Sequence, residues 1–299
     1  MSDDHAVDQA TEIFVAHRNL LFTVAYEMLG SAADAEDVLQ ETWLRWIKVD
    51  LEQVRDQRAY LVRITTRQAL NRLRTMNRRK ESYLGPWLPE PLLTAPDVAQ
   101  DTELAESVSM AVMLVLETLS PTERAVFVLR EVFDVSYDEI ATTVDKTPAA
   151  VRQIAHRARR HVDARHPRKV VSQSQTRAAL ESFVHALESG DPQALLDVLA
   201  PEVVYMGDGG GVKHAALRPI LGADKVSRLF AGGLGKNTVP ITFSPIAVNG
   251  SPALAIHLDG ELDAIFAARV EDGRITGIYV VRNPEKLSRI ASETPLALR

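Results

Sequence analysis

Apolar residues recur every three to four positions through most of the first 165 residues, which predicts a largely helical N-terminal part. A first helix through Phe14 and Leu29 is expected to stop at Gly30, and Ser31 is placed to cap a second helix. A third helix is expected from about residue 58 to residue 80. The first 80 residues therefore predict a module of three helices.

Two helix starts follow one another between residues 120 and 139. Ser120-Pro121-Thr122-Glu123 and Ser136-Tyr137-Asp138-Glu139 both place a serine at the cap and a glutamate three residues later. Thr147-Pro148 then opens a helix whose apolar face comprises Val151, Ile154, Ala155, Ala158 and Val162. Its opposite face carries Arg152, Gln153, His156, Arg157, Arg159 and Arg160. This succession is typical of a helix-turn-helix that docks in the major groove of DNA.

A proline-rich segment separates the two helical parts. Residues 81–102 contain Pro86, Pro89, Pro91 and Pro96, and prolines at this density exclude a helix. We therefore expect a linker here, followed by a second helical module from Glu103 to about residue 165.

The pattern changes after the polar run at residues 171–174. Two helices are expected through Leu180 and Leu195, then a strand from Val203 and a helix over residues 226–234. Four apolar runs follow, at 241–248, 253–258, 261–270 and 274–282. They are separated by Asn249-Gly250, Asp259-Gly260 and Asp272-Gly273, which are typical hairpin dipeptides. The pattern predicts an α+β domain in which a curved antiparallel sheet wraps around a few helices.

Composition places the 299-residue chain among soluble globular proteins, with 46% apolar and 25% charged residues. The chain contains no cysteine, which excludes disulfides and cysteine-based zinc sites and favours an intracellular location. The acidic start and the absence of a long apolar run predict neither a signal peptide nor a membrane span. We therefore expect a cytoplasmic protein with no membrane partner, and the eight scattered histidines indicate no metal site.

The net charge of −6 hides two compact basic segments. Residues 55–80 hold nine Lys and Arg against one Asp, and residues 146–169 hold eight against one Asp. Such segments attract phosphate locally, whereas the acidic remainder of the chain limits indiscriminate binding. For either segment alone, a solvated helix face is the alternative interpretation.

Together these features resemble the extracytoplasmic-function sigma factors of bacteria. The resemblance covers residues 10–165 and rests on the helix-turn-helix and on two segments of the first module. These segments are Ala35-Glu36-Asp37-Val38-Leu39-Gln40-Glu41-Thr42-Trp43-Leu44, and Arg58-Ala59-Tyr60-Leu61-Val62-Arg63-Ile64 leading into Asn71-Arg72-Leu73-Arg74. The resemblance implies a factor that joins core RNA polymerase, recognises a two-part promoter and helps to melt it. It implies no catalysis.

The resemblance also implies roles for individual residues. The acidic second helix would bind core RNA polymerase through Asp34, Asp37, Gln40, Glu41 and Trp43. The basic third helix would meet the minus-ten promoter element through Arg58, Arg63, Arg67, Asn71 and Arg74. In the second module, Arg152, Gln153 and His156 would read bases of the minus-thirty-five element, and Arg157, Arg159 and Arg160 would contact its backbone. A core position for Trp43 or Trp46, and surface ion pairs for single arginines, are the structural alternatives.

The C-terminal part resembles a SnoaL-like domain, the cone-shaped fold shared with polyketide cyclases and ketosteroid isomerase. One subgroup of these sigma factors carries such an extension and three motifs with counterparts here. They are Trp87-Leu88-Pro89-Glu90-Pro91-Leu92, Asp208-Gly209-Gly210-Gly211 and Asn283-Pro284-Glu285-Lys286-Leu287. The subgroup's lysine directly follows the third glycine, whereas here Val212 precedes Lys213. The resemblance implies that the extension regulates the factor by touching the linker and the DNA-binding modules, in place of a separate anti-sigma protein.

We predict four parts, namely residues 8–80 (sigma region 2), 81–102 (linker), 103–168 (sigma region 4) and 174–299 (SnoaL-like regulatory domain). No cofactor is expected. One alternative is a cyclase or isomerase that uses polar groups of a cone-shaped pocket: Tyr205, Asp208, His214, His257, Asp259, Asp263 and Tyr279. Another is a one-component regulator or repressor that binds duplex DNA without polymerase. A small-molecule ligand in an apolar pocket of the last domain is also open.

Overall fold

The computed structural model describes residues 2–94, 108–165, 171–234 and 239–290. Within these ranges the chain divides into two compact units. We call Met1–Glu81 together with Val112–His166 the helical unit, and Ser82–Ala111 together with Pro167–Ala297 the sheet unit. The linker segment therefore belongs to the sheet unit. The part of the predicted linker and second module at residues 95–107 lies outside the described residues.

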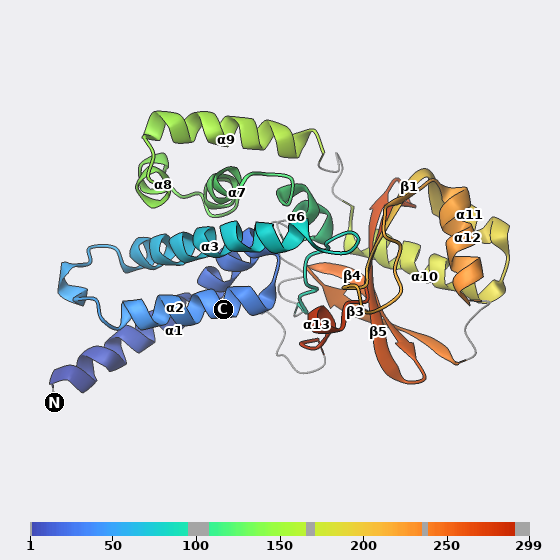
Figure 1. Ribbon diagram of the computed structural model, residues 1–299, viewed down its shortest axis with the longest axis horizontal. Helices are drawn as coiled ribbons and strands as arrows, with labels where there is room; N and C mark the ends of the chain where they lie inside the picture. Colours follow the sequence, from blue (N-terminus) through green and yellow to red (C-terminus); the bar gives the residue numbers. More distant parts are fainter. Residues whose placement is uncertain (1, 95–107, 166–170, 235–238, 291–299) are drawn as a thin grey trace. The chain divides into compact units, whose positions relative to one another are not determined.

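Three helices form the first half of the helical unit: α1 (Ser2–Leu29), α2 (Ala32–Trp46) and α3 (Gln57–Glu81), with a short 3-10 turn η1 (Leu51–Gln53) before α3 (Figure 1). Gly30 takes a left-handed φ of +67° after α1, and the Ser31 hydroxyl accepts the Asp34 N–H at 3.2 Å. The predicted stop and restart are confirmed. Trp46 is fully buried and donates its indole N–H to the Ala10 carbonyl, so this tryptophan belongs to the core.

The second half comprises α6 (Met110–Leu116), α7 (Pro121–Phe127), the π-helical turn η2 (Val128–Val132), α8 (Tyr137–Val144) and α9 (Pro148–Asp163). Both predicted capping boxes are formed, Ser120 with Glu123 and Ser136 with Glu139. The apolar face predicted for α9 is buried in full. The helix-turn-helix prediction is confirmed.

The two halves pack into one body, because α3 lies along both α7 and α8 (Figure 1). A buried ionic network stands at their junction. Arg124, 1% exposed, donates to the Glu117 carboxylate at 2.7 Å and to the Glu27 carbonyl at 2.7 Å. Glu117 also accepts a bond from Lys80 of α3. The network thus joins α1, α3, α7 and the end of α6.

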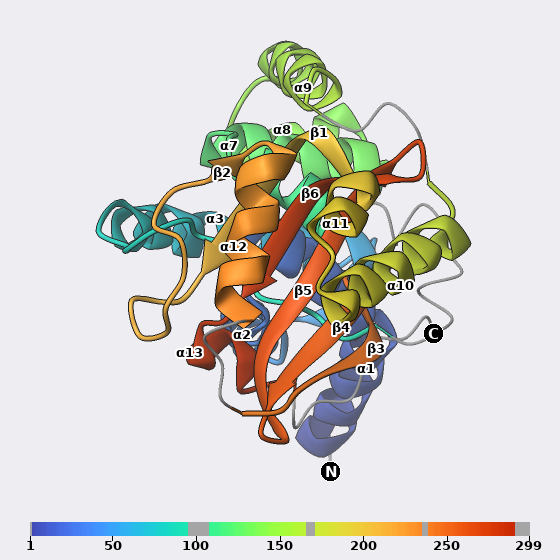
Figure 2. The ribbon, with the colours of Figure 1, turned by 90° about the vertical axis from the view of Figure 1, so that its right-hand side faces the viewer.

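The sheet unit holds a six-stranded sheet in the order β2-β1-β6-β5-β4-β3. The strands are β1 (Leu199–Asp208), β2 (Ile220–Leu221), β3 (Ile241–Val248), β4 (Ser251–Leu258), β5 (Glu261–Glu271) and β6 (Arg274–Val281). Helices α10 (Gln173–Ser189), α11 (Pro192–Val198) and α12 (Ala223–Leu234) pack on one face, as Figure 2 shows. A short helix α13 (Pro284–Leu287) follows β6.

The three predicted hairpin turns are present. Asn249, Asp259 and Asp272 have φ of 54°, 52° and 49°, and each is followed by a left-handed glycine. One pairing differs from the expected antiparallel sheet, because β1 runs parallel to β6. The hairpin dipeptides define only strands that follow one another, whereas β1 and β6 are joined through four strands and a helix, a connection long enough for parallel pairing.

No helix among the described ranges is both long and apolar enough to cross a bilayer. Likewise, the described residues bring together no group of three or more His, Asp or Glu side chains that fits a metal ion.

Candidate functional site

The exposed side of α9 carries all six residues predicted for the minus-thirty-five element: Arg152, Gln153, His156, Arg157, Arg159 and Arg160. Two of the arginines have acidic partners. The Arg159 guanidinium donates two bonds to the Glu131 carboxylate, at 2.6 and 2.9 Å, and Arg157 lies 3.4 Å from Glu123. These bonds orient side chains that remain exposed.

An aromatic ring supports the start of this surface. Tyr137, the first residue of α8, has the Arg130 guanidinium 4.9 Å and the Arg152 guanidinium 5.9 Å from its ring centroid. Arg130 is itself held by the Val135 carbonyl at 3.1 Å. Tyr137 therefore contributes to the position of Arg152, a role that the sequence pattern did not reveal.

The predicted minus-ten residues lie along α3, but in different environments. Arg58, Asn71 and Arg74 are exposed, whereas Arg63 is half-buried over the Tyr60 ring at 4.7 Å. Arg67 donates to the carbonyls of Thr142 and Thr143 at the end of α8. The structure thus leaves most of this row accessible but engages Arg67 within the helical unit.

The predicted polymerase-binding row lies on α2. Asp34 and Asp37 both pair with Arg72 of α3, each at 2.6 Å. Gln40 and Glu41 are exposed, and Trp43 is half-buried with its ring 5.3 Å from that of Phe14. Arg72 lies in the segment Asn71-Arg72-Leu73-Arg74, and the sequence alone predicted no role for it. Only the folded chain brings α3 beside α2.

In the sheet unit, the three predicted regulatory motifs converge on Asp208. Its carboxylate is buried and accepts the Tyr83 hydroxyl at 2.5 Å, the Leu88 N–H at 3.0 Å and the Lys286 ammonium at 2.7 Å. Burial, followed by the bond to the Asp208 carboxylate, raises the pKa of the Tyr83 phenol. We call this cluster the Asp208 dock.

Lys286 joins the dock to the proline-rich motif. Its ammonium donates to the Leu88 carbonyl at 2.6 Å and lies 3.6 Å from the Trp87 ring centroid. Asn283 donates to the Tyr83 hydroxyl at 2.9 Å. A β-carbon added to Gly210, which has φ of +66°, would meet the Asn283 side chain at 2.5 Å, so the glycine motif allows this close approach.

The other motif residues lie nearby. Pro89, Glu90, Pro91, Leu92, Gly209 and Leu287 are buried, whereas Gly211, Pro284 and Glu285 are exposed. Lys213, the displaced lysine, pairs with Asp263 at 3.0 Å and not with Asp208. The bond network of the dock therefore uses Lys286 and leaves Lys213 outside it.

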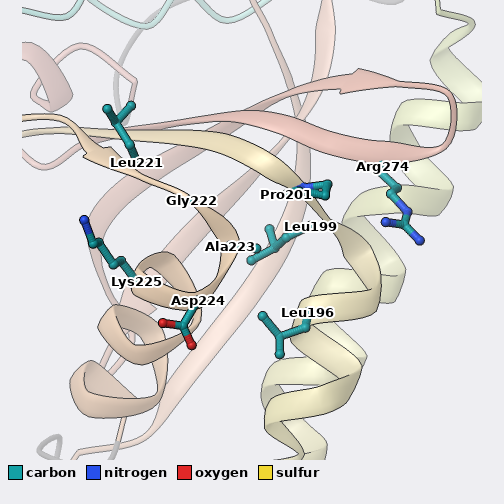
Figure 3. Close-up of a pocket in the computed structure, with 9 residues that line it drawn as sticks. All are labelled: Leu196, Leu199, Pro201, Leu221, Gly222, Ala223, Asp224, Lys225 and Arg274. Carbon is teal, nitrogen blue, oxygen red and sulfur yellow. The ribbon is translucent and has the colours of Figure 1, made fainter.

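Two of the polar groups of the enzyme alternative lie in different surroundings. Tyr205 packs in the interior cluster against Phe230, whereas Asp263 binds Lys213 and Arg282. An open pocket of about 440 Å³ lies beside α11, β1 and α12 (Figure 3). It is lined by Leu196, Leu199, Pro201, Leu221, Gly222, Ala223, Asp224, Lys225 and Arg274. None of the polar groups of the enzyme alternative lines this pocket.

The chain contains a helix-turn-helix with a basic recognition helix, a second basic helix and a docked linker. These features define a transcription factor with two DNA-binding modules. Residues 13–79 match the protein family described as Sigma-70 region 2, and residues 109–162 match the family described as Sigma-70, region 4. The chain belongs to the extracytoplasmic-function sigma factors of RNA polymerase. It is therefore a promoter-specificity factor and not an enzyme, and its partners are core RNA polymerase and promoter DNA.

Two curated relatives match over nearly the whole chain. The ECF RNA polymerase sigma factor SigJ of Mycobacterium tuberculosis (strain H37Rv) is 36% identical over 298 residues, which covers 92% of each chain. The probable ECF RNA polymerase sigma factor SigI of the same species (strain CDC 1551) is 30% identical, covering 96% of this chain and 97% of that one. The crystal structure of SigJ matches with a TM-score of 0.75 and 32% identity, over 93% of this chain and 98% of that chain. The predicted fold class, two helical modules followed by an α+β domain, is confirmed.

Proposed function

We propose that the sheet unit regulates this sigma factor by holding its linker in the Asp208 dock. The observation that carries the proposal is the buried Lys286–Asp208 pair, which binds both backbone groups of Leu88. A buried ion pair of this kind is strongly destabilised when one partner is removed. Whether the linker is docked therefore depends on a small number of identifiable contacts.

The same proposal includes the roles that the resemblance implies for three helices. The predicted residues of α9 and α3 contact promoter DNA, and those of α2 bind core RNA polymerase. Exposure of the α9 arginines supports contact with the minus-thirty-five element, and the exposed cations of α3 support contact with the minus-ten element. We likewise propose the division into residues 8–80, 81–102, 103–168 and 174–299, a cytoplasmic location, and regulation without a separate anti-sigma protein.

The test is promoter-specific run-off transcription with core RNA polymerase and the full chain. Lys286→Met keeps the length of the side chain but removes the ammonium that holds Leu88 and Asp208. We expect its transcript yield to differ from that of the unchanged protein by about tenfold, the effect of losing one strong buried contact. Equal yields would refute regulation through the dock.

Lys213→Met is the matched control. It also removes a lysine that pairs with an aspartate of the sheet unit, but Lys213 has no bond to the linker in the described residues. Its yield is expected to equal that of the unchanged protein. A chain that ends at Lys169 completes the comparison, because it lacks Asp208 and Lys286.

A further inference from the structure

The turn between β3 and β4 contacts two residues that are 16 positions apart in sequence, Leu92 of the linker and Val108 shortly before α6. The Asn249 side-chain oxygen accepts the Leu92 N–H at 3.1 Å, and its side-chain nitrogen donates to the Val108 carbonyl at 2.9 Å. The Asn249 N–H also donates to the Leu92 carbonyl at 2.8 Å. Asn249, Leu92 and Val108 are 1%, 6% and 0% exposed, so these bonds are shielded from water.

From these contacts we infer that Asn249 is a positioning residue that sets the reach of the linker between the two DNA-binding modules. This inference rests on the proposed regulation by the sheet unit and names a second contact through which it acts. We call Asn249, Leu92 and Val108 the linker clip. One primary amide closes the clip, because its oxygen and its nitrogen hold opposite ends of a 16-residue interval.

Neighbouring bonds fix the first end of the clip. Leu93 pairs with Val248 as an antiparallel bridge, and the Thr94 N–H donates to the Ala247 carbonyl at 3.2 Å. The Thr94 hydroxyl accepts the Gly250 N–H at 3.2 Å. The linker therefore forms a short antiparallel bridge with the outer edge of β3.

The length of the chain shows what the clip changes. An extended chain from residue 81 to residue 112 reaches about 105 Å, at about 3.4 Å per residue. With Leu92 and Val108 on the same amide, the same path reaches about 60 Å. The two promoter elements are, by their names, centred about 25 base pairs or roughly 85 Å apart. The clip removes about 45 Å of reach, the length of roughly 13 base pairs, so that once α3 has separated from α7 and α8 it still limits how far apart the two modules can move to contact both elements.

The experiment uses full-length variants and two measurements, hydrogen exchange of the Leu92 amide and run-off transcription with core polymerase. Asn249→Gly removes the amide but suits the φ of +54°, so the turn is kept. Asn249→Asp keeps the acceptor for Leu92 and removes the donor to Val108, and aspartate already occupies the same conformation at Asp259 and Asp272. Asp259→Gly is the matched control, a hairpin turn at the opposite end of β4.

We expect Asn249→Gly to speed exchange of the Leu92 amide about tenfold and to raise the transcript yield by up to about tenfold. Asn249→Asp should leave the Leu92 exchange slow and still raise the yield, because the clip needs both ends. If Asn249 only stabilised the turn, the Leu92 exchange and the transcript yield would change together in Asn249→Asp as well. Asp259→Gly should change neither.

In one outcome, Asn249→Gly speeds exchange of the Leu92 amide without changing the transcript yield, whereas Lys286→Met still alters transcription. This outcome would overturn the inference, and the proposed regulation would stand. Slow exchange in Asn249→Gly would also overturn it, since Asn249 would then not hold Leu92. Unchanged yields in both Asn249→Gly and Lys286→Met would refute the proposed function together with the inference.

Discussion

The guanidinium of Arg67 donates to the backbone carbonyl of Thr142 at 2.7 Å, and its Nε donates to that of Thr143 at 3.2 Å. Both carbonyls lie in the last turn of α8, where carbonyls lack partners within the helix. Arg67 therefore caps a helix of the helix-turn-helix from a predicted minus-ten surface. These bonds use two of the five N–H groups of the guanidinium and tie Arg67 to α8.

Replacing Arg67 by alanine should loosen the packing of α3 against α8 in the free protein. Because Arg67 is exposed, we expect a loss near the lower end of about 0.5 to 1.5 kcal/mol. The chain has no cysteine, so Asp8→Cys in α1 and Asp163→Cys in α9 can each carry a dye. Energy transfer between the two dyes then reports the distance between the first and second halves of the helical unit. Lower transfer is expected for Arg67→Ala but not for Arg63→Ala, which lacks a bond to α8 in the described residues.

Arg124→Met should strongly destabilise the helical unit. The substitution leaves Glu117 buried with Lys80 alone and the Glu27 carbonyl without the Arg124 bond. We expect a loss of about 3 to 5 kcal/mol in the free energy of unfolding, measured by urea titration. Arg130→Met serves as the control, because its partner Asp134 is 87% exposed and the expected loss is below about 1 kcal/mol.

The same network makes stability depend on pH. Burial alone would raise the pKa of the Glu117 carboxyl, but the charges and hydrogen bonds of Arg124 and Lys80 outweigh burial and lower it below the ordinary 4.5. The stabilisation is therefore present above pH 4.5 and is lost as the pH falls through the lower, folded-state pKa. The difference in urea midpoint between the unchanged protein and Glu117→Gln should shrink as the pH is lowered from 7 to 3. A constant difference would contradict this assignment.

Tyr137 should tune promoter recognition without touching DNA. We expect Tyr137→Leu to weaken binding to the minus-thirty-five element by about 0.5 to 1 kcal/mol, the value of an exposed cation–π contact, because Arg152 loses its aromatic support. Tyr137→Phe keeps the ring and should restore binding. Competition between duplexes that differ at one base pair measures the effect, and the loss should be largest for the base that Arg152 reads.

Local features of the fold were predictable because their determinants lie within a few residues. The capping boxes at Ser120 and Ser136 and the turns at Asn249, Asp259 and Asp272 are examples. The parallel pairing of β1 with β6 depends on residues far apart in sequence, and the hairpin dipeptides carry no information about it.

The site followed the same rule. The resemblance predicted the motifs at residues 87–92, 208–211 and 283–287, and the structure brings Leu88, Asp208 and Lys286 together. It gave no sign that Asn249, interpreted as a turn residue, binds Leu92, 157 positions away. Nor did it show that Arg67 caps α8, because a basic side chain on a helix face fits DNA and a helix carbonyl equally well.

The bridge between Leu93 and Val248 also bears on how copies of this protein behave toward one another. β3 ends the sheet, and the linker occupies part of its outer edge. Removal of the linker would present unpaired N–H and C=O groups there, and such an edge pairs readily with strands of other molecules. A molecule whose linker has been released is therefore expected to self-associate through this edge more readily than one whose linker is docked.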